Sequence, residues 1–196
     1  MLSLGFERED DAIRQAVQDA FTKDKIILAA ASNSSSIIPK KRVSYPARIQ
    51  GQVLSIRSAT GQNVRSDASP KPSDGDDNFM ILGEGIEAAW PLDLNEDHPT
   101  RYVSGSSFAT PVAAGIASLV LEFSIQRGKR GPNVPKESAG TLWTYRGIRK
   151  IFRYMSAVDD QSVNIDCSMI YPWKLFDADG DYEVYGLEIK RLMKSA

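Results

Sequence analysis

One serine-containing stretch has the residue types and the position for nucleophilic chemistry. It reads Gly105-Ser106-Ser107-Phe108-Ala109-Thr110-Pro111 and continues into small and apolar residues as far as Val120. A hydroxyl at a helix N-terminus lies beside unpaired backbone N–H groups and the positive end of the helix dipole, and both stabilise a developing negative charge. Gly105 permits a sharp turn before the helix, and a proline in the first helical turn costs little. The alternative is a buried helix whose serines serve only as caps.

Asn33 is a second candidate, because it directly follows a predicted strand. The apolar run Ile26–Ala31 is typical of a strand that is covered on both faces, as in a parallel sheet. The run ends in the polar residues Ser32-Asn33-Ser34-Ser35-Ser36. Ligands bind at the carboxyl ends of strands in open α/β sheets, so a functional side chain is expected here. An asparagine in an ordinary turn is the alternative.

Other groups that could do chemistry are few. The chain has one histidine, His98, in a predicted loop over residues 91–100, and one cysteine, Cys167, so it can form no intrachain disulfide and a cysteine-based zinc site is not expected.

Two acidic segments could in principle bind a cation. Asp74, Asp76 and Asp77 lie in the turn-rich residues 58–78, and we favour a solvated acidic loop over a metal site. Residues 177–188 share part of a calcium-loop pattern, but Tyr182 stands where that loop needs glycine, so we expect a turn. We predict no metal and no cofactor.

The elements that must position Ser107 and Asn33 indicate an α/β fold. We expect a strand in residues 1–6, a helix from Asp10 to about Thr22 and a strand at 26–31, which together form a βαβ unit. Further strands are expected at 53–56 and 79–82, helices at 107–123 and within 141–158, and an exposed loop or linker between these helices. This order predicts a three-layer fold in which helices flank a mostly parallel sheet.

Composition narrows the classes of partner. The 196 residues include 24 basic and 25 acidic side chains, which argues against nucleic acid or an anionic membrane bound by bulk charge. No uninterrupted apolar run reaches the roughly 18–20 residues of a membrane span, so no membrane partner is expected. Low cysteine use and an N-terminus unlike a signal peptide suggest a cytoplasmic location.

Taken together, these stretches resemble the subtilisin-like (S8) serine peptidases. The serine stretch is similar to the family motif G-T-S-[MF]-A-[ST]-P, with Ser106 for the usual threonine. The resemblance implies that Ser107 is the nucleophile, that Gly105 belongs to the substrate site, and that serine endopeptidase activity is the function.

Three further segments extend the resemblance to about residue 125. Residues 30–33 look like the family's A-A-G-N, which implies that Asn33 donates to the oxyanion and that Ala31 and Ser32 line the substrate pocket. Ser32 replaces a glycine, which would narrow the pocket floor. Residues Ser3, Leu4 and Gly5 resemble the S-L-G strand that pairs with an extended peptide substrate, and residues 45–47 resemble the family's Y-P-A.

The acid and base of the family's triad have no counterpart in this sequence. Their motifs, D-[ST]-G and H-G-T-H, precede the S-L-G strand in the family; neither occurs here, and His98 lacks the H-G-T context. A serine hydroxyl without a base is a poor nucleophile at neutral pH.

We therefore expect a fragment. Residues 1–125 would form the C-terminal half of a peptidase domain, incomplete at its N-terminal side, and residues 126–196 a linker and small extension. It would be inactive alone and need an upstream Asp/His segment. Details such as A-A-S-N and Tyr171-Pro172-Trp173 resemble intracellular S8 domains of fungal multidomain proteins.

Two other hypotheses remain. The chain could be a non-catalytic peptide-binding or scaffold remnant, in which the Ser3–Gly5 edge still adds a strand from a peptide. A hydrolase of the G-x-S-x-G type is disfavoured, because Ala109 replaces the second glycine and no histidine follows Ser107.

Overall fold

The computed structural model describes residues 1–33, 42–91, 99–126, 140–156, 167–177 and 181–194. Along the chain its elements are α1 (Asp11–Thr22), β1 (Ile27–Ala30), β2 (Val53–Ala59), β3 (Phe79–Leu82), β4 (Ile86–Ala89), β5 (Thr100–Val103), α2 (Ser106–Ile125), α4 (Tyr145–Ser156), β6 (Ser168–Met169), the 3-10 turn η2 (Pro172–Lys174) and α5 (Tyr182–Lys194).

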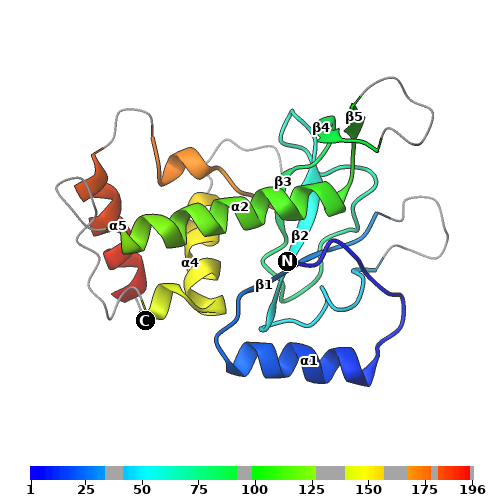
Figure 1. Cartoon of the computed structure of the whole chain (residues 1–196), viewed down its shortest axis with the longest axis horizontal. Helices are drawn as coiled ribbons and strands as arrows, with labels where there is room; N and C mark the ends of the chain where they lie inside the picture. The colour runs from blue at the N-terminus through cyan, green and yellow to red at the C-terminus, as the bar shows by residue number, and fades with distance from the viewer. Residues whose placement is uncertain (34–41, 92–98, 127–139, 157–166, 178–180, 195–196) are drawn as a thin grey trace.

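A four-stranded parallel sheet in the order β1-β2-β3-β6 forms the centre of the fold (Figure 1). All seven residues of β2 are buried, as its position between two strands requires. Residues 1–6 form no continuous strand, contrary to our expectation. Leu2 instead bridges to β1, with its amide 2.8 Å from the Leu28 carbonyl oxygen, and Phe6 bridges to Tyr45.

Helices cover both faces of the sheet, which confirms the predicted three-layer α/β fold. α2 packs on one face, where Ala109, Ala113 and Val120 share a core with Leu54 and Ile56. On the other face, Val17 of α1 packs against Ala29 and Val53. The strands alternate side chains between these two layers, so β1 and β2 each contribute to both cores.

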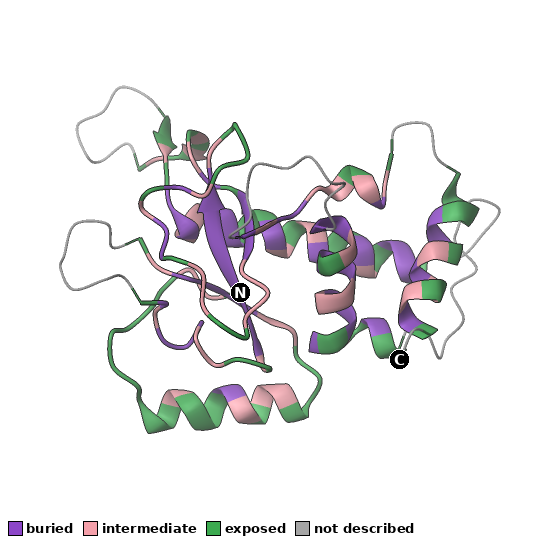
Figure 2. Cartoon of the chain, turned by 180° about the vertical axis from the view of Figure 1, so that it is seen from behind, coloured by how far each residue is buried: buried purple, intermediate pink, exposed green. Residues whose placement is uncertain are grey.

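The described C-terminal residues pack against the same core as the rest of the chain. α4, η2 and α5 add Ile148, Phe152 and Ile189 to the same core as α2, and β6 continues the sheet beside β3. Figure 2 shows buried residues on the inner sides of α4 and α5. The predicted boundary after residue 125 stays a prediction. The sequence predicts none of β4, β5, β6 and α5, and of β5 only Thr100 lies in the expected loop 91–100.

α2 is also the one helix in the described ranges that is long and apolar enough to cross a membrane, with a mean hydropathy of 1.7. Its sequence is not an uninterrupted apolar run, because serine, threonine and glycine occur among the apolar residues. The core helix of a soluble protein meets the same test, and α2 packs against β1, β2 and β3.

The acidic loop is only partly solvated, because arginines pair with two of its three carboxylates while Asp74 is exposed. Asp76 accepts a hydrogen bond from the fully buried Arg57 of β2, at 3.3 Å. Asp77, whose side chain is 9% exposed, accepts from both Arg149 and Arg153 of α4. These ion pairs fasten the loop to the sheet on one side and to α4 on the other.

In the second acidic segment, residues 178–180 lie outside the described residues. Tyr182 begins α5, and Glu188 pairs with Arg191 within that helix. Over the described ranges, no group of three or more side chains could hold a metal ion.

Candidate active site

The turn before α2 presents Ser107 at the helix N-terminus. Gly105 adopts φ +137°, a conformation that side chains disfavour, and its amide donates to the Gly83 carbonyl oxygen at 2.7 Å. A Cβ atom at Gly105 would lie 2.7 Å from Nδ2 of Asn33. The glycine therefore allows both the backbone turn and the close approach of the asparagine.

Asn33 is held against this turn by Ser106. The Ser106 amide donates to Asn33 Oδ1 at 2.6 Å, and the Ser106 hydroxyl lies 2.8 Å from the same oxygen and 3.0 Å from the Ser32 carbonyl oxygen. Because both donors of Ser106 face Oδ1, the Nδ2 end of the amide is directed toward Ser107.

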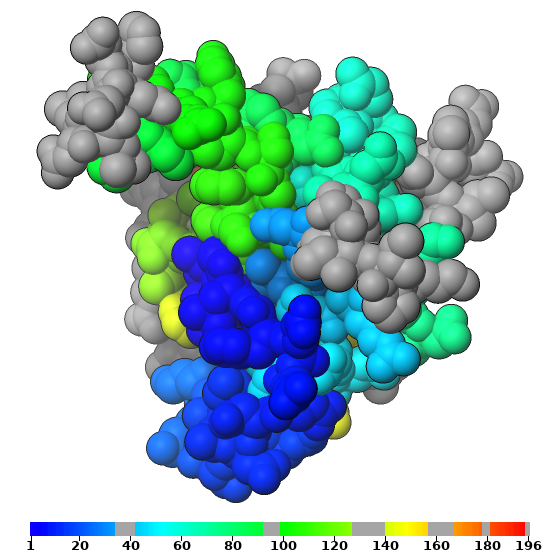
Figure 3. All heavy atoms as spheres, turned by 90° about the vertical axis from the view of Figure 1, so that its right-hand side faces the viewer, coloured from blue at the N-terminus to red at the C-terminus, as the bar shows by residue number. Residues whose placement is uncertain are grey.

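Ser107 lies where three separate segments meet. Asn33 Nδ2 is 3.4 Å from the Ser107 hydroxyl oxygen, across 74 residues of sequence, and that hydroxyl donates to the Ser3 carbonyl oxygen at 3.2 Å. In Figure 3 the first residues of the chain lie directly beside α2. The structure thus brings Ser107, Asn33 and Ser3 together, while their roles in catalysis and binding stay predictions.

The other residues assigned to substrate binding lie around these three. Ala31 is buried, and its carbonyl oxygen accepts from the Ser44 amide at 2.6 Å. Gly5 packs so closely on Ser44 that a Cβ atom there would lie 2.5 Å from the serine's Cβ, and Leu4 is 52% exposed. Ser44 therefore lies between the two segments that flank Ser107.

Sequence reasoning missed three of these contributors. The side chain of Ser106, the packing of Ser44 and the acceptor role of Gly83 all depend on contacts between distant segments. For Gly83, its position directly after β3 was the sequence feature that could have indicated a role in the site. A Cβ atom there would lie within 3.0 Å of Ser58 Oγ, Ala109 Cβ and the Gly105 carbonyl oxygen.

Tyr45 anchors the segment that follows the Asn33 loop. Burial raises the pKa of its phenol, so the group stays protonated and donates to the Asp10 carbonyl oxygen at 3.2 Å.

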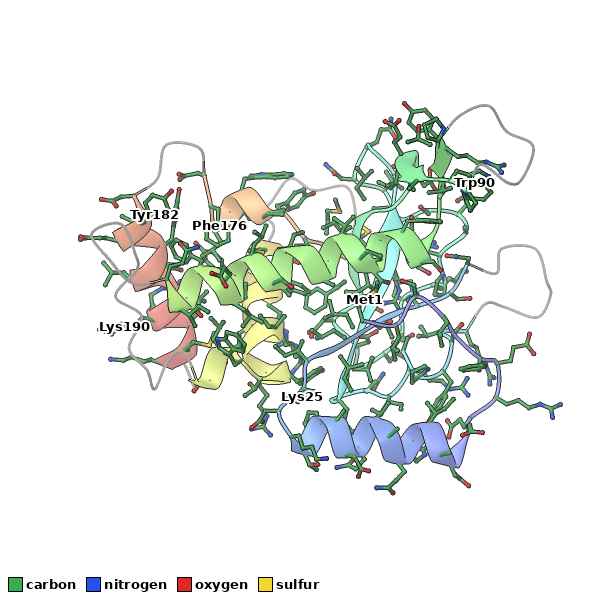
Figure 4. All side chains as sticks on the ribbon, viewed as in Figure 1. Met1, Lys25, Trp90, Phe176, Tyr182 and Lys190 are labelled. Carbon is green, nitrogen blue, oxygen red and sulfur yellow. The ribbon has the colours of Figure 1, made fainter. Side chains whose placement is uncertain are left out.

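His98, the chain's one histidine, lies outside the described residues. Trp90, labelled in Figure 4, directly follows β4, and the guanidinium of Arg101 in β5 lies 4.8 Å from its ring centre.

Comparison with known proteins assigns this arrangement to a family. Residues 2–132 match the family model of the subtilases, peptidase family S8. The chain belongs to the subtilase family, a family of serine peptidases.

Individual relatives agree with this assignment. The subtilisin-like protease het-Q2 of Podospora anserina is 31% identical over 152 residues, which are 72% of this chain and 40% of that protein. Thermitase of Thermoactinomyces vulgaris is 30% identical over 61% of this chain and 38% of its own length. The chain thus spans about two fifths of the curated relatives that it matches.

A solved structure supports the fold. The prenylagaramide maturation protease PagA superposes with a TM-score of 0.62 at 21% identity, over 88% of this chain and 58% of that one. At this identity the likeness concerns the fold alone.

Proposed function

We propose that this chain provides the nucleophile and oxyanion half of a subtilisin-like serine endopeptidase. Ser107 would attack the carbonyl carbon of an extended peptide, and the Asn33 amide would donate to the oxyanion that forms. The approach of Asn33 Nδ2 to within 3.4 Å of the Ser107 hydroxyl, at the N-terminus of α2, is the observation that carries the proposal.

The backbone adds to this electrostatic environment. The first N–H groups of a helix have no carbonyl partner within the helix, so the start of α2 is suited to negative charge. When the tetrahedral intermediate collapses, the peptide C–N bond breaks, the amine leaves with a proton, and water later hydrolyses the acyl-serine. Each proton transfer needs a base that also acts as an acid.

We further propose that this base comes from a polypeptide segment carrying the family's Asp and His motifs. The Ser107 hydroxyl donates to a carbonyl oxygen of Ser3, which cannot take up its proton. The chain alone would therefore be inactive, and activity would need the Asp/His segment.

A fluorophosphonate probe tests this proposal. The chain would be expressed alone and extended by the coding sequence upstream of Met1, and labelling rates compared. We expect labelling of the extended polypeptide only, and its loss in Ser107→Ala. Removal of one oxyanion donor costs about 10²–10³ in kcat, a value measured on subtilisin itself, so Asn33→Ala should slow labelling on that order. Labelling that persists in Ser107→Ala contradicts the proposal.

A second candidate function is peptide binding without catalysis. Residues 3–5 lie between the bridges at Leu2 and Phe6, and among the described residues they pair with no strand. An extended peptide could add to this edge through backbone hydrogen bonds. Binding of fluorescent peptides to the chain alone, unchanged by Ser107→Ala, would favour this function over the first.

A further inference from the structure

Three buried serines form a hydrogen-bonded cluster at the end of β2. Ser58 lies in β2, Ser66 and Ser69 follow in the loop before β3, and each is at most 1% exposed. The Ser66 hydroxyl donates to the Ser58 hydroxyl oxygen at 2.9 Å. The Ser69 hydroxyl accepts from the Ser58 amide at 2.9 Å and lies 3.2 Å from the Ser58 carbonyl oxygen. Because paired polar groups in a core are rigid, this serine cluster holds the Ser58 hydroxyl in place.

The Ser58 hydroxyl packs directly against Gly83, the residue that follows β3. A Cβ atom at Gly83 would lie 2.6 Å from Ser58 Oγ, 2.8 Å from Ala109 Cβ and 3.0 Å from the Gly105 carbonyl oxygen. These three groups close on one side of the Gly83 Cα atom, and they come from β2, from α2 and from the turn before α2. The backbone of Gly83 therefore has no free space on that side.

Gly83 connects the serine cluster to the candidate active site. Its amide donates to the last carbonyl oxygen of β2 at 3.0 Å, and its own carbonyl oxygen accepts from the Gly105 amide at 2.7 Å. Gly105 begins the turn that presents Ser107, and the Asn33 side chain packs on this glycine. Direct contacts thus connect Ser58, through Gly83, to the Gly105 turn.

We infer that Ser58 is a positioning residue for the proposed peptidase reaction. This inference rests on the proposed function. The Ser58 hydroxyl, held by the serine cluster, supports Gly83 and so sets the position of the Gly105 turn. That turn determines how Ser107 lies relative to Asn33, and both have to act on the same carbonyl group of a substrate. Ser58 acts through the backbone and contributes no group to the reaction itself.

Hydrogen–deuterium exchange of backbone amides, followed by NMR in the chain alone, tests this positioning without reference to activity. Ser58→Ala removes the hydroxyl that packs on Gly83. Ser55→Ala is the matched control, because Ser55 is also buried in β2 but its hydroxyl has no hydrogen-bond partner among the described residues. Its side chain points to the opposite face of the sheet. Relative to the amides of α4, the Gly105 amide should exchange about tenfold faster in Ser58→Ala and at the parent rate in Ser55→Ala.

The reference to α4 separates positioning from a general loss of stability. Global unfolding exposes every amide, so a purely structural role of Ser58 would accelerate exchange at Gly105 and in α4 by the same factor. That result, or an unchanged Gly105 amide, overturns the inference. If Ser58→Ala does not fold, Ser66→Ala decides. It keeps the packed hydroxyl but removes its hydrogen bond, and it should accelerate exchange at Gly105 more than in α4; equal factors overturn the inference.

In the extended polypeptide, the same variants test the effect on the reaction. Misplacement of a reacting group by about 1 Å can cost about 10²-fold in rate, so Ser58→Ala should lower the maximal rate of fluorophosphonate labelling by about tenfold. The probe concentration that gives half of this rate should not change, because residues 3–5 are untouched. Equal maximal rates for Ser58→Ala and Ser55→Ala overturn the inference. If the parent does not label at all, the proposed function fails, and the exchange rates at Gly105 alone decide whether Ser58 sets this turn.

A double-mutant cycle measures the contact between Ser58 and Gly83 independently. Gly83→Ala places a Cβ atom 2.6 Å from Ser58 Oγ and should lower the Tm of the chain alone. Ser58→Ala removes the nearest of the three groups around that atom, so the loss of Tm from Gly83→Ala should be smaller in the Ser58→Ala chain than in the parent chain. Additive losses overturn the inference.

Discussion

The turn at Ser107 and the C-terminal helices are attached to the same sheet by different kinds of contact. The turn depends on short polar contacts between Gly105, Ser106 and Asn33, with a glycine at the point of closest approach. α4 and α5 depend on apolar packing, as in the edge-to-face pair of Phe79 and Phe152 at 5.6 Å. Around Phe123, the rings of Phe176, Tyr182 and Tyr185 gather at the end of α2; Figure 4 labels two of them.

This difference determines what each region tolerates. Polar contacts are directional, so the turn should respond to changes of a single atom or a few degrees of backbone rotation. Apolar packing is non-directional and depends on the volume filled, so the C-terminal region should respond mainly to cavities. Four predictions test this comparison, beginning with the largest effect.

Phe152→Ala should destabilise the whole chain, because Phe152 is fully buried in the core that joins α4 to the sheet. Loss of a buried phenylalanine costs about 3–5 kcal/mol. Urea unfolding followed by circular dichroism measures the change, with the 60% exposed Trp173→Ala as control. Two separate transitions instead of one would show that the C-terminal helices and the sheet do not share a cooperative core.

Gly105→Ala should displace the Asn33 side chain and strain the backbone, at a cost of about 1–3 kcal/mol. Gly115→Ala, on the exposed side of the same helix, is the matched control and should stabilise the isolated chain by up to about 1 kcal/mol. Thermal unfolding gives both values. The same sign for both variants would contradict the close packing at Gly105.

Asp77→Asn should weaken the attachment of α4 to the loop at residues 73–78. Asp77 accepts from Arg153 Nε at 2.6 Å and also from Arg149, and hydrogen bonds to charged groups contribute about 1.5–3 kcal/mol. In hydrogen–deuterium exchange, the backbone amides of α4 should exchange faster in the variant than in the parent chain, and those of β2 should change less. Asp74→Asn is the control, since Asp74 accepts from Gln50 through its backbone carbonyl.

A smaller effect on stability is expected when the pH is lowered, through the pair of Glu188 and Arg191 in α5. The hydrogen bond from Arg191 holds the pKa of Glu188 below its ordinary value of 4.5. Because the folded pKa is the lower one, this stabilisation is present above the ordinary pKa and is lost as the pH falls through the folded value. The Tm of Glu188→Gln should therefore vary less with pH below 4.5 than that of the parent chain. Parallel pH profiles would show that the pair has no effect on stability.

The sequence predicted most of the elements that build the site. Apolar runs located β1 and β3, spacing located α1 and α2, and the residue types around Ser107 and Asn33 indicated where these side chains would lie. It missed α5, a helix of 13 residues, and it missed short strands whose residues carry little local signal. β6 is two residues long, and β5 is mostly exposed. Each is paired with a neighbouring strand, β6 with β3 and β5 with β4.

What the sequence determined by itself is local: the turn allowed by Gly105, the apolar character of α2 and the polar ends of the strands. The tertiary structure decided which end of the Asn33 amide faces Ser107, because that depends on Ser106, 73 residues away. It also decided that Asp76 and Asp77 are paired with arginines, and which side of α2 is left open. These features depend on contacts between segments that are far apart in the sequence, and residue types and their spacing do not show which distant segments will meet.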